Sequence, residues 1–170
     1  IIEFIIILLV SSLLKRKSVL KVKELLKNID DSFELIVLDE TARTAEDAAK
    51  SLKKEVGAIV KSLIFKTSDN DFYLCLVSGD NYISEKKLTV IIEKKVTKAS
   101  ADEVKNQTGY SIGGVPPIAH IYPPSNIFID ENLKRYDIIY AAAGHPYVVF
   151  GITFENLCKI TKGEISDIVN

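Results

Sequence analysis

The sequence has few of the residues that build metal centres, disulfide bonds and redox sites. Its 170 residues include two cysteines and two histidines, with no methionine and no tryptophan. Cys75 and Cys158 lie far apart and form no CxxC pair, so we expect two free thiols in a reducing compartment, the cytoplasm. His120 and His145 are isolated as well, so the ligand set of a metal site is missing and none is expected.

The chain also lacks a strong net charge. The formal charge is −1, with 47% hydrophobic and 26% charged residues, which is ordinary for a globular protein. A chain of this length forms one domain by default and can bury a sizeable core. Proteins that coat duplex nucleic acid carry a broad basic field, which is missing here. Any contact with nucleic acid should therefore be local, made with an end or a tip.

No apolar run is long enough to cross a membrane. Residues 1–14 are nearly all apolar and are followed by Lys15, Arg16 and Lys17, but a spanning helix needs roughly 20 residues. A signal peptide carries its positive charges before the apolar segment, not after it. Three interpretations of this segment stay open: an extra helix or strand buried in the body or in a dimer, a clipped membrane anchor, or non-native sequence. We favour the first.

We therefore divide the chain into an apolar extension, residues 1–17, and one domain, residues 18–170. In the mature form we expect no membrane association and a monomer or a homodimer. Helices are predicted at 18–28, 45–53, 84–92, 101–108 and 153–163, and strands at 33–38, 58–65, 72–77, 126–129, 137–143 and 147–152. A capping box at Ser100 and Glu103 starts the helix at 101–108, Gly109 ends it, and the strands at 58–65 and 72–77 form a hairpin. Because strands and helices interleave without a strict βαβ rhythm, the pattern predicts an α+β domain on a mixed sheet.

Lys61 interrupts an otherwise apolar strand. Alternation along residues 58–65 places it on one face together with Ile59, Leu63 and Phe65. A buried lysine is uncommon unless it is paired. The ammonium either reaches solvent at a sheet edge or lines a pocket and meets an anion. A register slip of one residue would turn every side chain of this strand to the opposite face of the sheet. The pattern alone therefore leaves both possibilities open.

Glycine and proline are concentrated in residues 109–117, which hold three of the eight glycines and two of the five prolines. Paired glycines permit positive φ and close approach of a ligand, whereas paired prolines fix φ and remove two N–H donors. We expect a stiff loop with free amides at Gly113, Gly114 and Val115, able to bind an anion. A plain connection between a helix and a strand is the alternative. Lys61 is the reason to favour a functional loop.

Seven short segments occur in the order and spacing of a known family. They are residues 44–49, 59–65, 99–104, 108–110, 113–117, 129–130 and 141–144. On these segments, residues 18–170 resemble the YbaK/EbsC family, which is related to the editing domain inserted in bacterial-type prolyl-tRNA synthetases. The resemblance implies a single α+β domain whose mixed, partly barrel-like sheet is flanked by helices.

The resemblance also implies an activity, that of a trans-editing aminoacyl-tRNA deacylase. Such proteins hydrolyse the ester between a wrong amino acid and the terminal adenosine of a tRNA, here tRNA(Pro) carrying Ala or Cys. The implied partners are the acceptor end of mischarged tRNA and an aminoacyl-tRNA synthetase, and the family uses no cofactor and no metal. Many relatives carry a histidine where this chain has Tyr147, which leaves the amino acid specificity open. A non-catalytic aminoacyl or nucleotide-binding module is the alternative.

Residue roles follow from the same resemblance. The family's functional lysine corresponds to Lys61, its substrate-bordering loop to residues 113–116, and its small-residue turn to residues 143–145. The residues expected to bind substrate are Ser62, Val115, Pro116, His120, Ala143 and Gly144. For His120, a structural hydrogen bond is the alternative role.

The chemistry does not require a protein nucleophile. The chain has no Gly-x-Ser-x-Gly elbow and no Ser/His/Asp set. An aminoacyl ester is labile, so the protein need only position a water or the ribose hydroxyl and stabilise an oxyanion. We expect the amides of Gly113 and Gly114 to stabilise the oxyanion, Lys61 to hold the terminal phosphate or polarise the carbonyl, and His145 to order the water. A solvent-facing turn is the alternative for His145. Stacking on the terminal base is one expectation for Tyr110 and Tyr122, and a place in the pocket wall is the alternative, which we favour.

Overall fold

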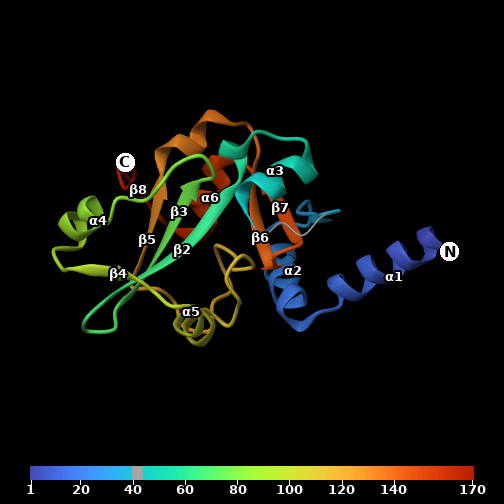
Figure 1. Cartoon of the computed structure of the whole chain (residues 1–170), viewed down its shortest axis with the longest axis horizontal. Helices are drawn as coiled ribbons and strands as arrows, with labels where there is room; N and C mark the ends of the chain where they lie inside the picture. Colours follow the sequence, from blue (N-terminus) through green and yellow to red (C-terminus); the bar gives the residue numbers. More distant parts are fainter. Residues whose placement is uncertain (40–43) are drawn as a thin grey trace.

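The computed structural model describes residues 1–39 and 44–170 and has the predicted α+β architecture (Figure 1). The helices are α1 (Ile2–Leu14), α2 (Lys17–Ile29), α3 (Ala45–Leu52), α4 (Glu85–Ile92), α5 (Ala101–Thr108) and α6 (Phe154–Thr161), with two 3₁₀ turns, η1 (Val56–Ala58) and η2 (Glu131–Arg135). The strands are β1 (Leu35–Val37), β2 (Val60–Thr67), β3 (Phe72–Ser78), β4 (Val96–Lys98), β5 (Asn126–Asp130), β6 (Ile139–His145), β7 (Val148–Ile152) and β8 (Glu164–Ser166).

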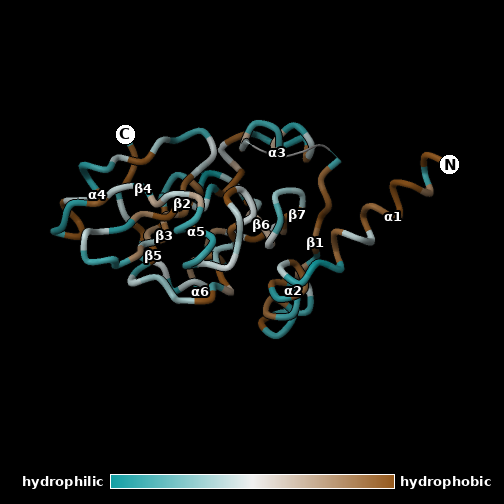
Figure 2. Tube along the Cα trace, turned by 60° about the horizontal axis from the view of Figure 1, so that its bottom comes forward, coloured by the Kyte–Doolittle hydropathy of each residue, from teal (hydrophilic) through white to brown (hydrophobic). Residues whose placement is uncertain are grey.

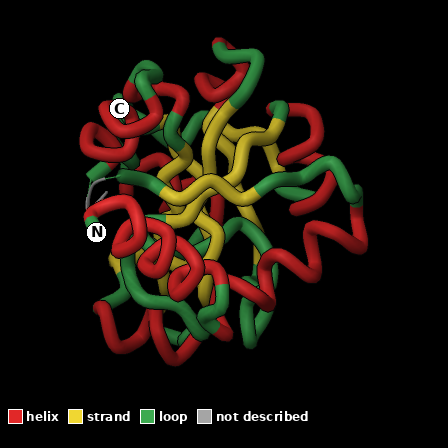
Figure 3. Tube along the Cα trace, turned by 90° about the vertical axis from the view of Figure 1, so that its right-hand side faces the viewer, coloured by secondary structure: helices red, strands yellow, loops and turns green. Residues whose placement is uncertain are grey.

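The strands form two sheets. The larger is mixed, with the order β4-β2-β3-β5-β8, in which β2 pairs antiparallel with β3 and β4, while β5 pairs parallel with β3 and β8. The smaller is antiparallel, with the order β1-β7-β6. A single parallel bridge between Ile59 and Tyr140 joins the start of β2 to β6. Within the described residues neither sheet closes into a barrel, so the partly barrel-like form consists of two open sheets that meet at this bridge. Figure 3 shows the strands at the centre with helices around them.

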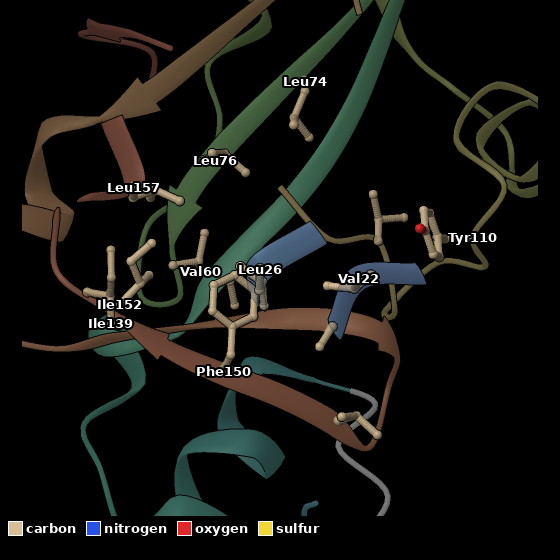
Figure 4. Packing of buried hydrophobic residues seen from close by; sticks show 14 of the residues in the cluster. Val22, Leu26, Val60, Leu74, Leu76, Tyr110, Ile139, Phe150, Ile152 and Leu157 are labelled. Carbon is tan, nitrogen blue, oxygen red and sulfur yellow. The ribbon is translucent and has the colours of Figure 1, made fainter. Parts of the chain in front are cut away.

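The main core lies where the two sheets and α2 come together. Leu26 of α2, Leu76 of β3 and Phe150 of β7 are almost completely buried there (Figure 4). Each such side chain contributes roughly 1.5–3 kcal/mol by leaving water. The opposite face of β2 and β3 packs into a second cluster with Leu88 of α4. On its other side β2 pairs with β4 only at residues 65–67, and residues 61–63 in its middle are half-buried.

Local hydrogen bonds explain where the helices begin and end. Ser100 and Glu103 form the predicted capping box at the start of α5, and Gly109 ends that helix with φ +88°. Thr44 caps α3 by accepting the amide of Asp47 at 3.1 Å, and Thr153 does the same for α6. These caps are short-range features, which is why the sequence pattern predicts them well.

The apolar N-terminal segment is α1, and it extends away from the body (Figures 1 and 2). Eight of its large apolar residues, from Ile1 to Leu9, are each more than half exposed, and only Leu13 is buried. Our expectation of an element buried in the body is therefore wrong for most of this helix. Burial in a dimer stays a prediction, as does the boundary between residues 17 and 18. None of the described helices is long and apolar enough to cross a membrane.

Candidate functional site

A cavity of about 90 Å³ lies between α3, the start of β2, the 113–115 loop and β6. Lys61, Ser62, Gly113 and Val115 line it, together with apolar side chains such as Ile59. The volume is enough for several water molecules. The cavity therefore brings together the lysine and the glycine-rich loop, which lie about 50 residues apart along the chain.

Lys61 is half-buried, with its ammonium held against the loop that follows β3. Its Nζ donates a hydrogen bond to the backbone carbonyl of Asn81 and lies 5.0 Å from the centre of the Tyr82 ring. Burial lowers the pKa of Lys61, while the charges of Glu46, Asp80 and Asp130 oppose this effect. Among the described residues no carboxylate lies within 4.0 Å of Nζ. The ammonium is thus oriented by a neutral carbonyl, and its charge is available to an anionic ligand.

A buried carboxylate fixes the position of Asn81. Asp130, at the end of β5, is 1% exposed. Its Oδ2 accepts the side-chain amide of Asn81 at 2.8 Å and the backbone amide of Ser78 at 3.1 Å. Its Oδ1 accepts the backbone and side-chain amides of Asn132 at 2.9 and 2.8 Å. A carboxylate that accepts four hydrogen bonds is held rigidly, so the Asn81 carbonyl that receives Lys61 is also fixed.

The glycine-rich loop is rigid, but one of its amides is not free. Gly113 has φ +86°, a conformation that favours glycine, and its amide and that of Val115 have no hydrogen-bond partner among residues 1–39 and 44–170. The amide of Gly114, however, donates to the carbonyl of Ser111 at 2.9 Å. Our expectation of a free amide at Gly114 is therefore wrong, because the tight turn uses that donor internally. Gly113 and Val115 keep the predicted arrangement.

Gly114 has a structural reason to be glycine. Its carbonyl accepts the amide of Gly144 at 3.1 Å, and a Cβ at position 114 would lie 2.9 Å from the Cα of His145. Gly144 itself has φ +92°, and a Cβ there would lie 2.4 Å from the carbonyl oxygen of Ser18. Ala143 is completely buried and, like these two glycines, is not part of the cavity wall. These residues hold the loop, the β6–β7 turn and α2 together.

Neither histidine lines the cavity. His120 donates from Nε2 to the carbonyl of Pro116 at 2.7 Å, and burial lowers its pKa, which keeps the ring neutral. It therefore braces the loop, as the structural alternative supposed. His145 accepts the amide of Tyr147 on Nδ1 at 3.1 Å. Burial and, to a smaller extent, the charge of Arg16 lower the pKa of His145. Its predicted role of ordering a water lacks support from this position.

The two tyrosines considered for base stacking differ in their exposure to solvent. Tyr110 is 2% exposed and its hydroxyl donates to the carbonyl of Ala119 at 3.0 Å, so it cannot stack on a ligand and that expectation is wrong. Tyr122 is exposed, but it does not line the cavity.

Ser62 lines the cavity and carries an unusual polar group. Its Oγ is buried and has no hydrogen-bond partner among the described residues. A buried hydroxyl without a partner costs roughly 1–3 kcal/mol. Buried polar groups are rarely left in this state unless they serve a ligand or a water molecule. Ser62 therefore combines a position in the cavity lining with a hydroxyl that is enclosed by the protein.

The cavity thus combines one available cation, unpartnered backbone amides and a buried hydroxyl. Such a set binds a small group whose oxygen carries negative charge, including the oxyanion that forms when an ester is hydrolysed. Residues 1–39 and 44–170 contain no cluster of His, Cys, Asp and Glu able to hold a metal ion. The site is therefore a small pocket that is lined by both polar and apolar groups.

Comparison with known proteins places the chain in a family. Residues 39–160 match the sequence model of the aminoacyl-tRNA editing domain, so the chain belongs to that family. It is 29% identical over 125 residues to YwhH of Bacillus subtilis, covering 74% of this chain and 79% of that protein. It is 26% identical over 126 residues to EbsC of Enterococcus faecalis, named as a candidate Cys-tRNA(Pro)/Cys-tRNA(Cys) deacylase, covering 74% and 76%. The resemblance to the YbaK/EbsC group is therefore confirmed.

Longer enzymes and solved structures give the same assignment. The chain is 31% identical over 120 residues to the proline–tRNA ligase of a Sulfurihydrogenibium species, and it spans 21% of that enzyme's length. The crystal structure of a candidate trans-editing enzyme for prolyl-tRNA synthetase superposes with a TM-score of 0.85 and 34% identity. That superposition covers 91% of this chain and 98% of the other. The two proteins therefore share the same fold over nearly their whole lengths.

Proposed function

We propose that this protein hydrolyses the ester bond of a mischarged aminoacyl-tRNA, with tRNA(Pro) carrying Ala or Cys as the expected substrate. The observation that carries the proposal is that Lys61 and Gly113 line the same small cavity. The names of EbsC and of the superposed trans-editing enzyme support the same reaction. We further propose that the protein acts in the cytoplasm, where tRNA is charged, alongside prolyl-tRNA synthetase.

In the proposed reaction the ester carbonyl enters the cavity. A water molecule, positioned by the pocket or by the neighbouring ribose hydroxyl, attacks the carbonyl carbon. The bond to the ribose oxygen breaks, and that oxygen takes up the proton that the water gives up, so that the free amino acid leaves. The amides of Gly113 and Val115 stabilise the oxyanion, and one well-aimed donor of this kind is worth about 3 kcal/mol in the barrier. Lys61 holds the terminal phosphate or polarises the carbonyl as a point charge.

The cavity also favours a small amino acid. A volume of about 90 Å³ leaves little room beyond the ester itself. We expect Ser62, which lines the cavity, to contact the bound aminoacyl group. Discrimination between small side chains is modest, since one methylene in a pocket is worth about 1–3 kcal/mol. The choice between Ala and Cys therefore depends on few contacts.

The test is a deacylation panel. Purified protein is given tRNA(Pro) charged with Ala, Cys, Ser or Pro, and release of the amino acid is followed over time. The Lys61→Ala variant is compared with Lys66→Ala as the matched control. Lys66 lies on the same strand, but its side chain pairs with Glu103 and does not line the cavity. We expect turnover of at least one mischarged species, loss of that turnover in Lys61→Ala, and retention in Lys66→Ala.

One observation favours a second function, that of a binding module without turnover. Neither histidine lines the cavity, so no general base is evident among its side chains. If the wild-type protein binds mischarged tRNA(Pro) but releases no amino acid from any member of the panel, this second function replaces the first.

A further inference from the structure

Tyr82 is an exposed aromatic side chain directly beside the cavity lysine. It is 73% exposed, and its ring centre lies 5.0 Å from Nζ of Lys61. Lys61 lines the cavity and Tyr82 does not, so the ring lies just outside, adjacent to the ammonium. A large aromatic ring left in water offers a flat surface that is free for a ligand.

The backbone beneath this ring is held in place on both sides. The Asn81 amide donates to Ser78 at 3.0 Å, and the Asn170 amide donates to the carbonyl of Tyr82 at 3.0 Å. Ile83 forms an antiparallel bridge with Val169. Asn81 is further tied to the buried carboxylate of Asp130. An exposed side chain on a fixed backbone loses little entropy when it binds a ligand.

The size of the cavity shows what must lie outside it. Pockets that enclose a whole drug-sized ligand measure about 300–1,000 Å³, whereas this cavity measures about 90 Å³. An aminoacyl-adenosine therefore cannot enter completely. If the ester carbonyl lies near Gly113 and Lys61, then the base, which is attached through the ribose, extends past the ammonium. Tyr140 lines the cavity itself, whereas Tyr82 is an aromatic residue outside it, beside that ammonium.

We propose that Tyr82 is the stacking platform for the terminal adenine base of the acceptor end. In this arrangement the base stacks on the Tyr82 ring, Lys61 contacts the adjoining phosphate or ester oxygen, and the aminoacyl group occupies the cavity. Lys61 also polarises the face of the ring through its charge, which strengthens contact with an electron-rich base. The proposal rests on the proposed deacylase function and assigns a nucleoside subsite within it.

The kinetic test compares Tyr82→Ala with Tyr82→Phe. Stacking of one base accounts for a factor of roughly 5 to 100 in affinity, so Tyr82→Ala should lower kcat/KM by that factor, mainly through KM. Tyr82→Phe keeps the ring and should stay within about two-fold of the wild type. Phe4→Ala, which removes an exposed aromatic ring from α1, is the matched control and should change nothing. Equal KM values in Tyr82→Ala and wild type would overturn the proposal, as would a loss confined to Tyr122→Ala.

A binding measurement separates this proposal from the deacylase proposal. Protein carrying ring-¹³C tyrosine is titrated with adenosine 5′-monophosphate and, in parallel, with ribose 5-phosphate, which lacks the base. The Tyr82 resonance is assigned from its absence in Tyr82→Phe. A shift with the nucleotide but not with the sugar phosphate supports the platform, even if the panel shows no hydrolysis. Hydrolysis without any shift of that resonance removes Tyr82 from the site and leaves the reaction standing.

Discussion

Replacing Gly114 with alanine tests how the loop is held against the β6–β7 turn. The added Cβ would lie 2.9 Å from Cα of His145 and 3.1 Å from its C and N, which are backbone atoms that cannot rotate away. The loop must move, and the hydrogen bond from the Gly144 amide is lost. Overpacking costs about 1–3 kcal/mol and a lost hydrogen bond about 1 kcal/mol, so the free energy of unfolding should fall by about 2–4 kcal/mol.

The assay is equilibrium unfolding in urea, with Gly113→Ala as the matched control. At position 113 a Cβ would meet Pro146 at 3.6 Å, an ordinary contact, so only the left-handed φ of +86° opposes alanine. That strain costs about 1–2 kcal/mol. Gly114→Ala should therefore be the less stable variant and should also lose deacylation activity because the cavity wall moves. A loss below about 0.5 kcal/mol, as for a surface substitution, would refute the reasoning.

Three further changes test the buried polar groups and the ion pair. The Ser62→Ala variant should be as stable as the wild type or more stable, because it removes an unpartnered hydroxyl. It should lower kcat/KM roughly 2- to 10-fold. A clear loss of stability in urea would show that Oγ has a partner in the free protein. Asp130→Ala should lower the free energy of unfolding by about 3–5 kcal/mol, because buried amides lose their acceptor; a change under about 1 kcal/mol would contradict the rigid network. The ion pair with Lys66 and, to a smaller extent, the hydrogen bond from the Ser100 amide lower the pKa of Glu103 from 4.5 to about 2. Their stabilising contribution is complete above pH 4.5 and is lost as pH falls through 2; a Glu103→Gln variant whose urea midpoint depends on pH as that of the wild type does would contradict this.

Much of the fold follows from short-range rules in the sequence. The capping box at Ser100, the stop at Gly109 and the β2–β3 hairpin each depend on residues close together in the chain, and each was predicted correctly. The strands β4 and β8 were not predicted. Each is three residues long and exists because it pairs with a distant strand at a sheet edge, which local pattern cannot reveal.

The features of the candidate site likewise fall into those that the local sequence predicts and those that depend on distant parts of the chain. Alternation along β2 placed Leu63 and Phe65 correctly on one face, where both pack in the second cluster. Of the two positions left open for Lys61, the structure shows it half-buried in the lining of the cavity. The partners of its ammonium, Asn81 and Tyr82, could not be predicted, because a loop 20 residues away must fold back onto β2. The use of the Gly114 amide inside its own turn was also hidden, because it depends on the conformation of the loop rather than on its composition.

The central claim is that a bound ester carbonyl lies between Lys61 and the amides of the glycine-rich loop. A crystal structure of the protein with 3′-alanylamino-3′-deoxyadenosine, whose amide resists hydrolysis, tests this directly. We predict its carbonyl oxygen within hydrogen-bonding distance of the amides of Gly113 or Val115, with the alanyl methyl group in the cavity beside Ser62. An analogue bound elsewhere on the surface, with the cavity holding only water, would contradict the account.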